Sequence, residues 1–239
     1  MEKGLSISQL NKLGERLRKG HASDDDLCAL DTFRLSFAAA CDHASHELKK
    51  LGLKPVSRPA KSTASIIAKL NRERGRLSKM QDIAGCRVEV DNIAQQDRVV
   101  KDIVAKFPDA VEYDRRLKPS HGYRAVHVVV DLHGFLVEIQ VRTSLQHGWA
   151  SAVERLADII DLDIKYGGGP EVLRDVLIKA SDTIAGVEAI EISLRDLHER
   201  DQVSPETDGL EAEVRRLKKD LQEALARTMI LEEEAARKP

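Results

Sequence analysis

Two carboxylates in the middle of the chain have surroundings that suit phosphate chemistry. Asp82 stands just before a short β-type run at 86–90, and Glu138 lies inside another such run at 135–142. Carboxylate oxygens are ligands that Mg²⁺ prefers, and Mg²⁺ in turn holds phosphates. Nearby cations would neutralise the charge that builds up during phosphoryl transfer. The pattern predicts a magnesium-dependent enzyme that acts on nucleotide phosphates.

The run at 135–142 alternates apolar and polar residues, as a strand does when its side chains point to opposite faces. The apolar face carries Phe135, Val137, Ile139 and Val141, and the other face carries Leu136, Glu138, Gln140 and Arg142. For this strand alone, an ordinary solvated face is the commoner outcome. A carboxylate, an amide and a guanidinium in a row would otherwise form one wall of a site.

A second run, 123–131, places Tyr123 and His127 on one face and valines on the other. If His133-Gly134 is a two-residue hairpin turn, His127 lies opposite Gln140 and the two polar faces join. A single Tyr or His is more often a packed side chain. Two joined polar faces favour a site, in which Tyr123 could stack on a base.

A basic stripe precedes both runs. We expect a helix over 62–78, and steps of three and four place on one of its faces Lys61, Ser65, Lys69, Arg72 and Arg76. Such cations bind phosphate oxygens well, although a solvated basic face is the commoner fate of a stripe like this.

Composition excludes several classes of protein. The 239 residues contain 38 Lys plus Arg and 40 Asp plus Glu, a net charge of −2, which argues against a surface built wholly for nucleic acid. Three cysteines support neither a disulfide framework nor a zinc finger. No apolar run of about 18 residues or signal peptide is present, so we expect no membrane span and a cytoplasmic protein. No P-loop or dinucleotide fingerprint occurs.

The order of patterns along the chain predicts an α/β (α+β) fold in three parts. Residues 1–52 read as a helical N-terminal extension, 53–165 as a mixed β-sheet core flanked by helices, and 166–239 as C-terminal helices. The tail has a heptad seam, spaced by four and three, at Leu210, Val214, Leu217, Leu221, Ala224, Thr228 and Leu231. This helix could pack back on its own chain or associate with a second copy.

Four strings resemble the synthetase domain of the RelA/SpoT family. In order they are DIAGCR (82–87), HGYRAVH (121–127), VEIQVRT (137–143) and LQHGWA (145–150). The resemblance implies a nucleotidyltransferase-like fold and transfer of pyrophosphate from ATP to the 3′-hydroxyl of GDP or GTP, which makes the alarmones ppGpp and pppGpp. It also implies Mg²⁺ as the cofactor.

The resemblance implies roles for individual residues. Asp82 matches the metal-binding aspartate, and Glu138 matches the catalytic glutamate, which also helps to hold the metal. The ATP-binding positions are Arg58, Lys61, Ser65, Lys69 and Arg87. The acceptor-binding positions are Arg116, Lys118, Tyr123, His127, Gln140 and Arg142, with Tyr123 stacking on the guanine.

Some positions depart from the family pattern, mainly where the acceptor is recognised. Arg58 stands one residue further from Lys61 than the family's Arg-x-Lys would place it, and the loop before Tyr123 lacks the usual Asn. The family's Lys-Asp-Tyr reads Val111-Glu112-Tyr113, which removes one lysine. These changes leave open a second acceptor, the 3′ CCA end of tRNA, as in toxic small relatives. A third reading is a non-catalytic nucleotide-binding relative.

The chain resembles small, single-domain synthetases rather than the long family members that carry a hydrolase. Such enzymes commonly assemble through helices, so we expect a homo-oligomer formed by the C-terminal helices. A toxin of the tRNA-modifying type would also imply an antitoxin partner.

Overall fold

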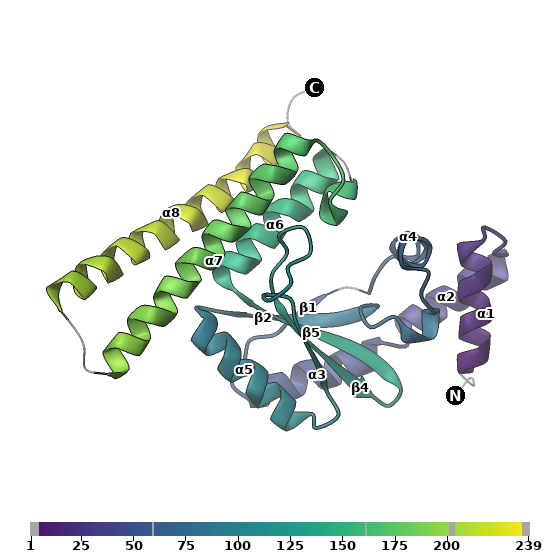
Figure 1. Cartoon of the computed structure of the whole chain (residues 1–239). Coiled ribbons are helices and arrows are strands. Elements are labelled where there is room, and N and C mark those ends of the chain that lie inside the picture. Colours follow the sequence, from purple (N-terminus) through teal and green to yellow (C-terminus); the bar gives the residue numbers. More distant parts are fainter. Residues whose placement is uncertain (1–4, 59, 161, 201–203, 236–239) are drawn as a thin grey trace. The chain divides into compact units, whose positions relative to one another are not determined.

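Helices and a five-stranded sheet make up the computed structural model, which describes residues 5–58, 60–160, 162–200 and 204–235 (Figure 1). The α-helices are α1 Ile7–Arg18, α2 Asp24–Leu35, α3 Ala38–Lys50, α4 Thr63–Glu73, α5 Ile93–Lys106, α6 Ser144–Ile159, α7 Glu171–Glu199 and α8 Pro205–Ala235. The strands are β1 Val56–Arg58, β2 Ala84–Val90, β3 Val111–Asp114, β4 Val126–Leu132 and β5 Phe135–Thr143. Two short 3₁₀ helices are η1 Leu77–Lys79 and η2 Leu162–Tyr166.

The sheet has the strand order β1-β2-β5-β4-β3, which confirms the predicted α/β (α+β) class. Strand β1 pairs antiparallel with β2, so that Arg58 lies opposite Gly85. The hairpin between β4 and β5 turns at His133 and Gly134, whose φ angles of 58° and 87° are both positive. Two successive residues with positive φ are typical of a tight hairpin turn, which is the turn that the sequence predicts.

Two compact units divide the described chain. The first comprises residues 1–88, 102–112 and 127–140, and the second comprises 89–101, 113–126 and 141–239. In the first unit, the N-terminal helices share an apolar cluster with α4 and η1 that includes Leu13, Leu30 and Leu70. The sequence-based division at residues 52 and 165 stays a prediction.

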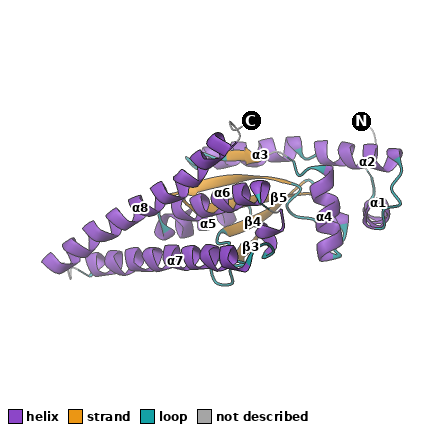
Figure 2. Cartoon of the chain, turned by 90° about the horizontal axis from the view of Figure 1, so that it is seen from above, coloured by secondary structure: helices purple, strands orange, loops and turns teal. Residues whose placement is uncertain are grey.

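In the second unit, α6, α7 and α8 pack on one another (Figures 1 and 2). Trp149, Ile184 and Val214 belong to their shared core, with Leu221 and Leu225 packed against it. Val214 and Leu221 of the heptad seam therefore pack on their own chain, as one of the two alternatives predicts, whereas the side chains of Thr228 and Leu231 lie outside the described part of the structure. Leu210 and Leu217 remain 43% and 39% exposed. Self-association through these helices stays a prediction.

The basic helix is shorter than the sequence predicts. Helix α4 ends at Glu73, because Arg74 adopts a left-handed conformation with φ of 50° and Gly75 follows it. A residue in this conformation ends a helix, as in a C-terminal cap. The prediction of one helix over 62–78 is therefore wrong in its last turn, and Arg76 does not continue the stripe of Lys61, Ser65 and Lys69.

The strand expected at 123–131 begins later, at Val126, so the prediction that Tyr123 lies on its polar face is wrong. His121 and Gly122 have positive φ angles of 52° and 89°, which a strand does not accommodate. Tyr123 instead closes a turn, with its N–H donating to the carbonyl of Ser120 at 2.9 Å.

Within the described residues, no helix combines the length and the apolar character that crossing a membrane requires.

Candidate active site

Asp82 is the centre of an ion-pair cluster in the first unit. Its Oδ2 lies 2.9 Å from Nζ of Lys61 and 2.8 Å from Nζ of Lys69. Lys69 lies on α4, and Lys61 lies just before Ser62, whose side chain caps the helix. The structure therefore brings together two lysines and a carboxylate that the sequence predicts to share one site.

The environment of Asp82 suits a metal ligand. Burial raises the pKa of this carboxyl, but the charges of Lys61 and Lys69 lower it by more, to about 2. Asp82 is therefore ionised at neutral pH. Its second oxygen, Oδ1, is buried and accepts no hydrogen bond from the residues that the structure describes. A cation could bind this oxygen without displacing either lysine, so the residues present fit Mg²⁺.

The start of the basic helix is held by α2. Arg34 donates from Nε to the carbonyl of Lys61 at 2.6 Å and from Nη1 to Oγ1 of Thr63 at 3.1 Å. Asp31 accepts hydrogen bonds from both Arg34 and Thr63, at 2.5 and 2.7 Å. The backbone of Lys61 is fixed on its other side as well, since its N–H donates to the carbonyl of Ile83 at 2.6 Å.

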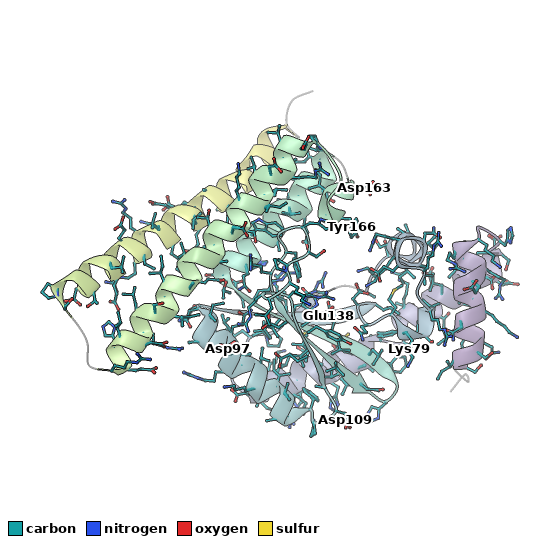
Figure 3. The ribbon with its side chains drawn as sticks, viewed as in Figure 1. Lys79, Asp97, Asp109, Glu138, Asp163 and Tyr166 are labelled. Atoms are coloured by element: carbon teal, nitrogen blue, oxygen red, sulfur yellow. The ribbon has the colours of Figure 1, made fainter. Side chains whose placement is uncertain are left out.

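Glu138 lies on β5 (Figure 3). It is only 8% exposed. Its Oε1 is 2.9 Å from Nδ1 of His127, and its Oε2 accepts a hydrogen bond of 2.5 Å from Nε2 of Gln140. Arg58 approaches Oε2 with Nη1 at 3.6 Å. The polar face of this strand is thus buried and hydrogen-bonded, and the alternative of a solvated face is wrong. Glu138 is therefore surrounded by three residues that the sequence also predicts for the site, namely His127, Gln140 and Arg58.

These contacts keep Glu138 ionised. Burial raises the pKa of this carboxyl, while His127 and Gln140 lower it by more, so that the pKa lies below its ordinary value. The negative charge of Asp82 acts in the opposite direction and raises the pKa of Glu138. Ionised carboxylates such as these are ligands that Mg²⁺ prefers. No group of three or more His, Cys, Asp or Glu suited to a metal occurs among the described residues, so phosphate and water would supply its other ligands.

Gly85 allows β2 to lie close to Glu138. A Cβ added at Gly85 would overlap the backbone carbonyl oxygen of Glu138. The glycine in the string DIAGCR is therefore required by the close approach of two strands.

Tyr123 and Arg142 form a separate pair in the second unit. Arg142 is 3% exposed, and its Nη2 donates to the hydroxyl of Tyr123 at 2.9 Å. The guanidinium carbon also lies 5.0 Å from the centre of the tyrosine ring. The ring is therefore held by a buried cation and is partly accessible.

The remaining predicted residues have varied surroundings. Lys118 is exposed on the loop that precedes Tyr123, and Arg87 lies on β2. The hydroxyl of Ser65 accepts a hydrogen bond from that of Ser62 at 2.8 Å. Arg116 pairs with Asp114 and Asp97, both at 2.7 Å, and contact with an acceptor phosphate would require these pairs to open. Burial lowers the pKa of this guanidinium, but the two carboxylates raise it above its usual value.

Comparison with known proteins places this site in a family. Residues 58–157 match the family described as the region found in RelA / SpoT proteins. The chain carries a RelA/SpoT region. An uncharacterized protein of Mycobacterium tuberculosis and one of Mycobacterium bovis are each 40% identical to this chain over 129 residues. The alignment covers 52% of this chain and 47% of each relative, so the chain spans about half the length of the curated relatives that it matches.

Solved structures support the fold of the RelA/SpoT region. The small alarmone synthetase 1 from Bacillus subtilis superposes with a TM-score of 0.57 and 24% identity, over 72% of this chain and 98% of that chain. A second structure of that synthetase, bound to AMPCPP, gives a TM-score of 0.50 and 21% identity, over 70% and 96% of the two chains.

The RelA/SpoT region contains all the site residues that the sequence predicts, since they lie between Arg58 and Arg142. Arg34, whose side chain holds the backbone of Lys61, lies outside this region. It precedes the lysine by 27 positions and is not among the residues that the sequence predicts for the site. Its only local signal is the i, i+3 pair with Asp31, which many surface helices share.

Proposed function

We propose that the chain is a magnesium-dependent pyrophosphokinase that transfers pyrophosphate from ATP to the 3′-hydroxyl of GDP or GTP. The observation that carries this proposal is the arrangement of two ionised carboxylates, the partly buried Asp82 and the buried Glu138, which are contacted by Lys61, Lys69 and Arg58. The match of residues 58–157 to the RelA/SpoT region supports the same chemistry.

Lys61, Lys69 and the start of α4 would bind the phosphates of ATP. The lysine ammonium groups supply charge, and the first backbone N–H groups of a helix favour an anion. Arg58, Ser65 and Arg87 are further candidates for this contact. Mg²⁺ bound to Asp82 and Glu138 would neutralise phosphate charge and polarise the bond that breaks.

The reaction forms a bond between the 3′-oxygen of the acceptor and the β-phosphorus of ATP. The bond from that phosphorus to the oxygen shared with the α-phosphate breaks, and AMP leaves. The hydroxyl proton passes to the carboxylate of Glu138, which His127 and Gln140 hold in place. Tyr123 would stack on the guanine, with Arg142 orienting its ring and Lys118 meeting acceptor phosphates.

A transfer assay with ATP labelled in its β-phosphate tests this proposal. Purified protein would be incubated with Mg²⁺ and either GDP, GTP, ATP or bulk tRNA, and the products would be separated. We expect labelled ppGpp or pppGpp, and loss of at least about 100-fold in kcat for Glu138→Gln. Absence of a labelled guanine nucleotide with wild-type protein that has a normal melting transition would reject the proposal.

An exposed group of cations favours a second candidate acceptor, the 3′ end of tRNA. Arg72, Arg74, Arg76 and Lys79 lie on or just after α4 and are all exposed. Clustered cations of this kind bind the phosphate backbone of RNA without reading its sequence. Labelled tRNA without labelled guanine nucleotide would identify this activity. Replacing Arg74 and Arg76 with Ser should then weaken tRNA modification and reduce its salt dependence.

A further inference from the structure

The loop that carries Tyr123 is held by α7, a helix outside the RelA/SpoT region. We propose that Ser181 and Glu188 of α7 are positioning residues, which set the conformation of the loop at 115–125 for the acceptor nucleotide. This inference rests on the proposed function in assigning the acceptor to the loop. The structural part, that α7 orders the loop, can be tested without any enzymatic activity.

The first anchor holds the residues on either side of Tyr123. Ser181 donates from its hydroxyl to the carbonyl of Gly122 at 2.5 Å and accepts a hydrogen bond from Nε of Arg124 at 3.0 Å. Asp182 accepts from Nη2 of Arg124, also at 3.0 Å. One helix turn of α7 therefore fixes the backbone before Tyr123 and the side chain after it.

Gly122 permits this close contact. Its φ is +89°, and an added Cβ would lie 2.7 Å from the ring of Trp149 and 3.3 Å from Cβ of Ser181. Trp149 is in turn fixed by α7, since its Nε1 donates to the carbonyl of Leu177 at 2.9 Å. The turn before Tyr123 is thus packed as well as hydrogen-bonded.

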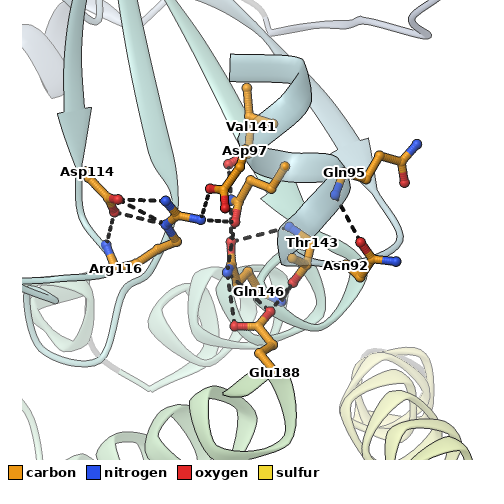
Figure 4. A network of polar contacts seen from close by, with 10 residues as sticks. Asn92, Gln95, Asp97, Asp114, Arg116, Val141, Thr143, Gln146 and Glu188 are labelled. Carbon is orange, nitrogen blue, oxygen red and sulfur yellow. Dashed lines mark hydrogen bonds and ion pairs between the residues drawn. The ribbon is translucent and has the colours of Figure 1, made fainter. Parts of the chain in front are cut away.

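The second anchor is a chain of hydrogen bonds from the loop to Glu188 (Figure 4). Arg116 donates from Nη1 to Oε1 of Gln96 at 3.1 Å, and Gln96 donates from Nε2 to Oε1 of Gln146 at 2.9 Å. Gln146 then donates from Nε2 to both oxygens of Glu188 at 3.1 Å. A cation at one end and a carboxylate at the other orient both amides, because each amide must donate towards Glu188.

Because the residues of this hydrogen-bond chain are buried, the chain is sensitive to the loss of any one of them. Gln96, Gln146 and Glu188 are 0%, 2% and 5% exposed. A buried amide that loses its hydrogen-bond partner is still desolvated, and nothing offsets that free-energy cost. Loss of one hydrogen bond is therefore expected to make the other residues of the network rearrange together. The two anchors also meet within the loop, because Arg124 donates from Nη1 to the carbonyl of Arg116 at 2.9 Å.

These contacts predict a preformed acceptor loop. Lys118 is exposed between the two anchors, whereas Arg116, Gly122 and Arg124 are fixed. Releasing either anchor would let the loop sample conformations in which Tyr123 cannot meet the base. Fewer binding-competent molecules raise the apparent dissociation constant of the acceptor and leave ATP binding at Lys61 and Lys69 unchanged.

The test uses full-length Glu188→Ala, Glu188→Gln and Ser181→Ala, with Asp175→Asn as a control on the exposed face of the same helix. Hydrogen–deuterium exchange of the nucleotide-free proteins reports the order of residues 115–125. We expect at least about tenfold faster exchange there for Glu188→Ala and Ser181→Ala, and unchanged exchange at 61–73. Glu188→Gln keeps one acceptor oxygen and should give a smaller effect. Unchanged exchange in the loop for both Ala variants would overturn the proposal.

Kinetics separate positioning from a general structural role. In the same variants we expect a rise of about tenfold or more in the KM of GDP or GTP, with unchanged binding of a non-hydrolysable ATP analogue. Equal weakening of acceptor and ATP would overturn the proposal. If wild-type protein modifies no acceptor at all, the proposed function fails, and the exchange result alone decides whether α7 orders the loop.

Discussion

Nε of Arg34 donates to the backbone carbonyl of Lys61 at 2.6 Å, so a helix near the N-terminus fixes a lysine that contacts Asp82. Replacement of Arg34 by Ala should raise the KM of ATP about tenfold with little change in kcat. A charge-assisted hydrogen bond contributes about 1.5–3 kcal/mol, and a tenfold change corresponds to about 1.4 kcal/mol. Titration calorimetry with an ATP analogue measures the effect. Arg18→Ala, which removes an exposed pair with Glu15, should bind the analogue normally.

The lysines around Asp82 predict how stability depends on pH. The pKa of Asp82 is lowered from 3.8 to about 2 in the folded protein, so its contribution is complete above pH 3.8 and is lost as the pH falls through 2. Asp82→Asn should therefore have a lower free energy of unfolding than the wild type at pH 5. The difference in free energy of unfolding between the two proteins should shrink by about 2 kcal/mol near pH 2. Urea unfolding across this range measures it. A difference that is independent of pH would contradict the ion-pair interpretation.

The close approach of β2 and β5 at Gly85 predicts that adding a single methyl group there lowers both stability and activity. Gly85→Ala would push β2 away from the carbonyl of Glu138 and should cost about 2 kcal/mol or more, with a marked fall in kcat. Gly75→Ala is the matched control, because a Cβ there meets no atom within 4 Å. Thermal unfolding and the transfer assay should distinguish the two variants. Equal activities would show that the strand spacing can relax.

Tyr123 has two groups that could act on the acceptor: its ring, which could stack on a base, and its hydroxyl, which accepts from Arg142. Tyr123→Phe keeps the ring and removes the oxygen that accepts from Nη2 of Arg142. We expect less than about a threefold rise in the acceptor KM for Tyr123→Phe and more than about tenfold for Tyr123→Ala, since stacking on a base contributes about 1–3 kcal/mol. Similar acceptor KM values for the two variants would exclude stacking as the role of this ring.

The sequence predicts those parts of the site that depend on local spacing. Lys69 on α4 and Lys61 just before its cap reach one carboxylate, because a spacing of eight residues places them on one side of this segment. The turn at His133 and Gly134 brings Glu138 to His127, because a two-residue hairpin fixes the pairing of its strands. In both cases a few neighbouring residues determine the geometry.

Other parts depend on backbone conformation or on distant contacts. Arg74 and His121 adopt positive φ, which is uncommon outside glycine, so the sequence gives little sign that α4 ends at Glu73 or that Tyr123 lies in a turn. Gln146 accepts a hydrogen bond from Gln96 and donates one to Glu188, positions that lie 50 and 42 residues away in the sequence. A single sequence carries no signal for such pairs, because any buried amide requires a partner but does not identify it.

The contacts of Arg34 have a consequence for how this catalytic segment can be exchanged between proteins. Residues 58–157 contain the proposed reacting groups, but the guanidinium that fixes Lys61 and the α7 side chains that hold Gly122 and Gln146 lie outside them. A chimera made at these boundaries would contain the proposed site residues but would lack the residues that hold them in position. Its activity would depend on whether the recipient supplies a donor to that carbonyl and a carboxylate at the end of the amide chain.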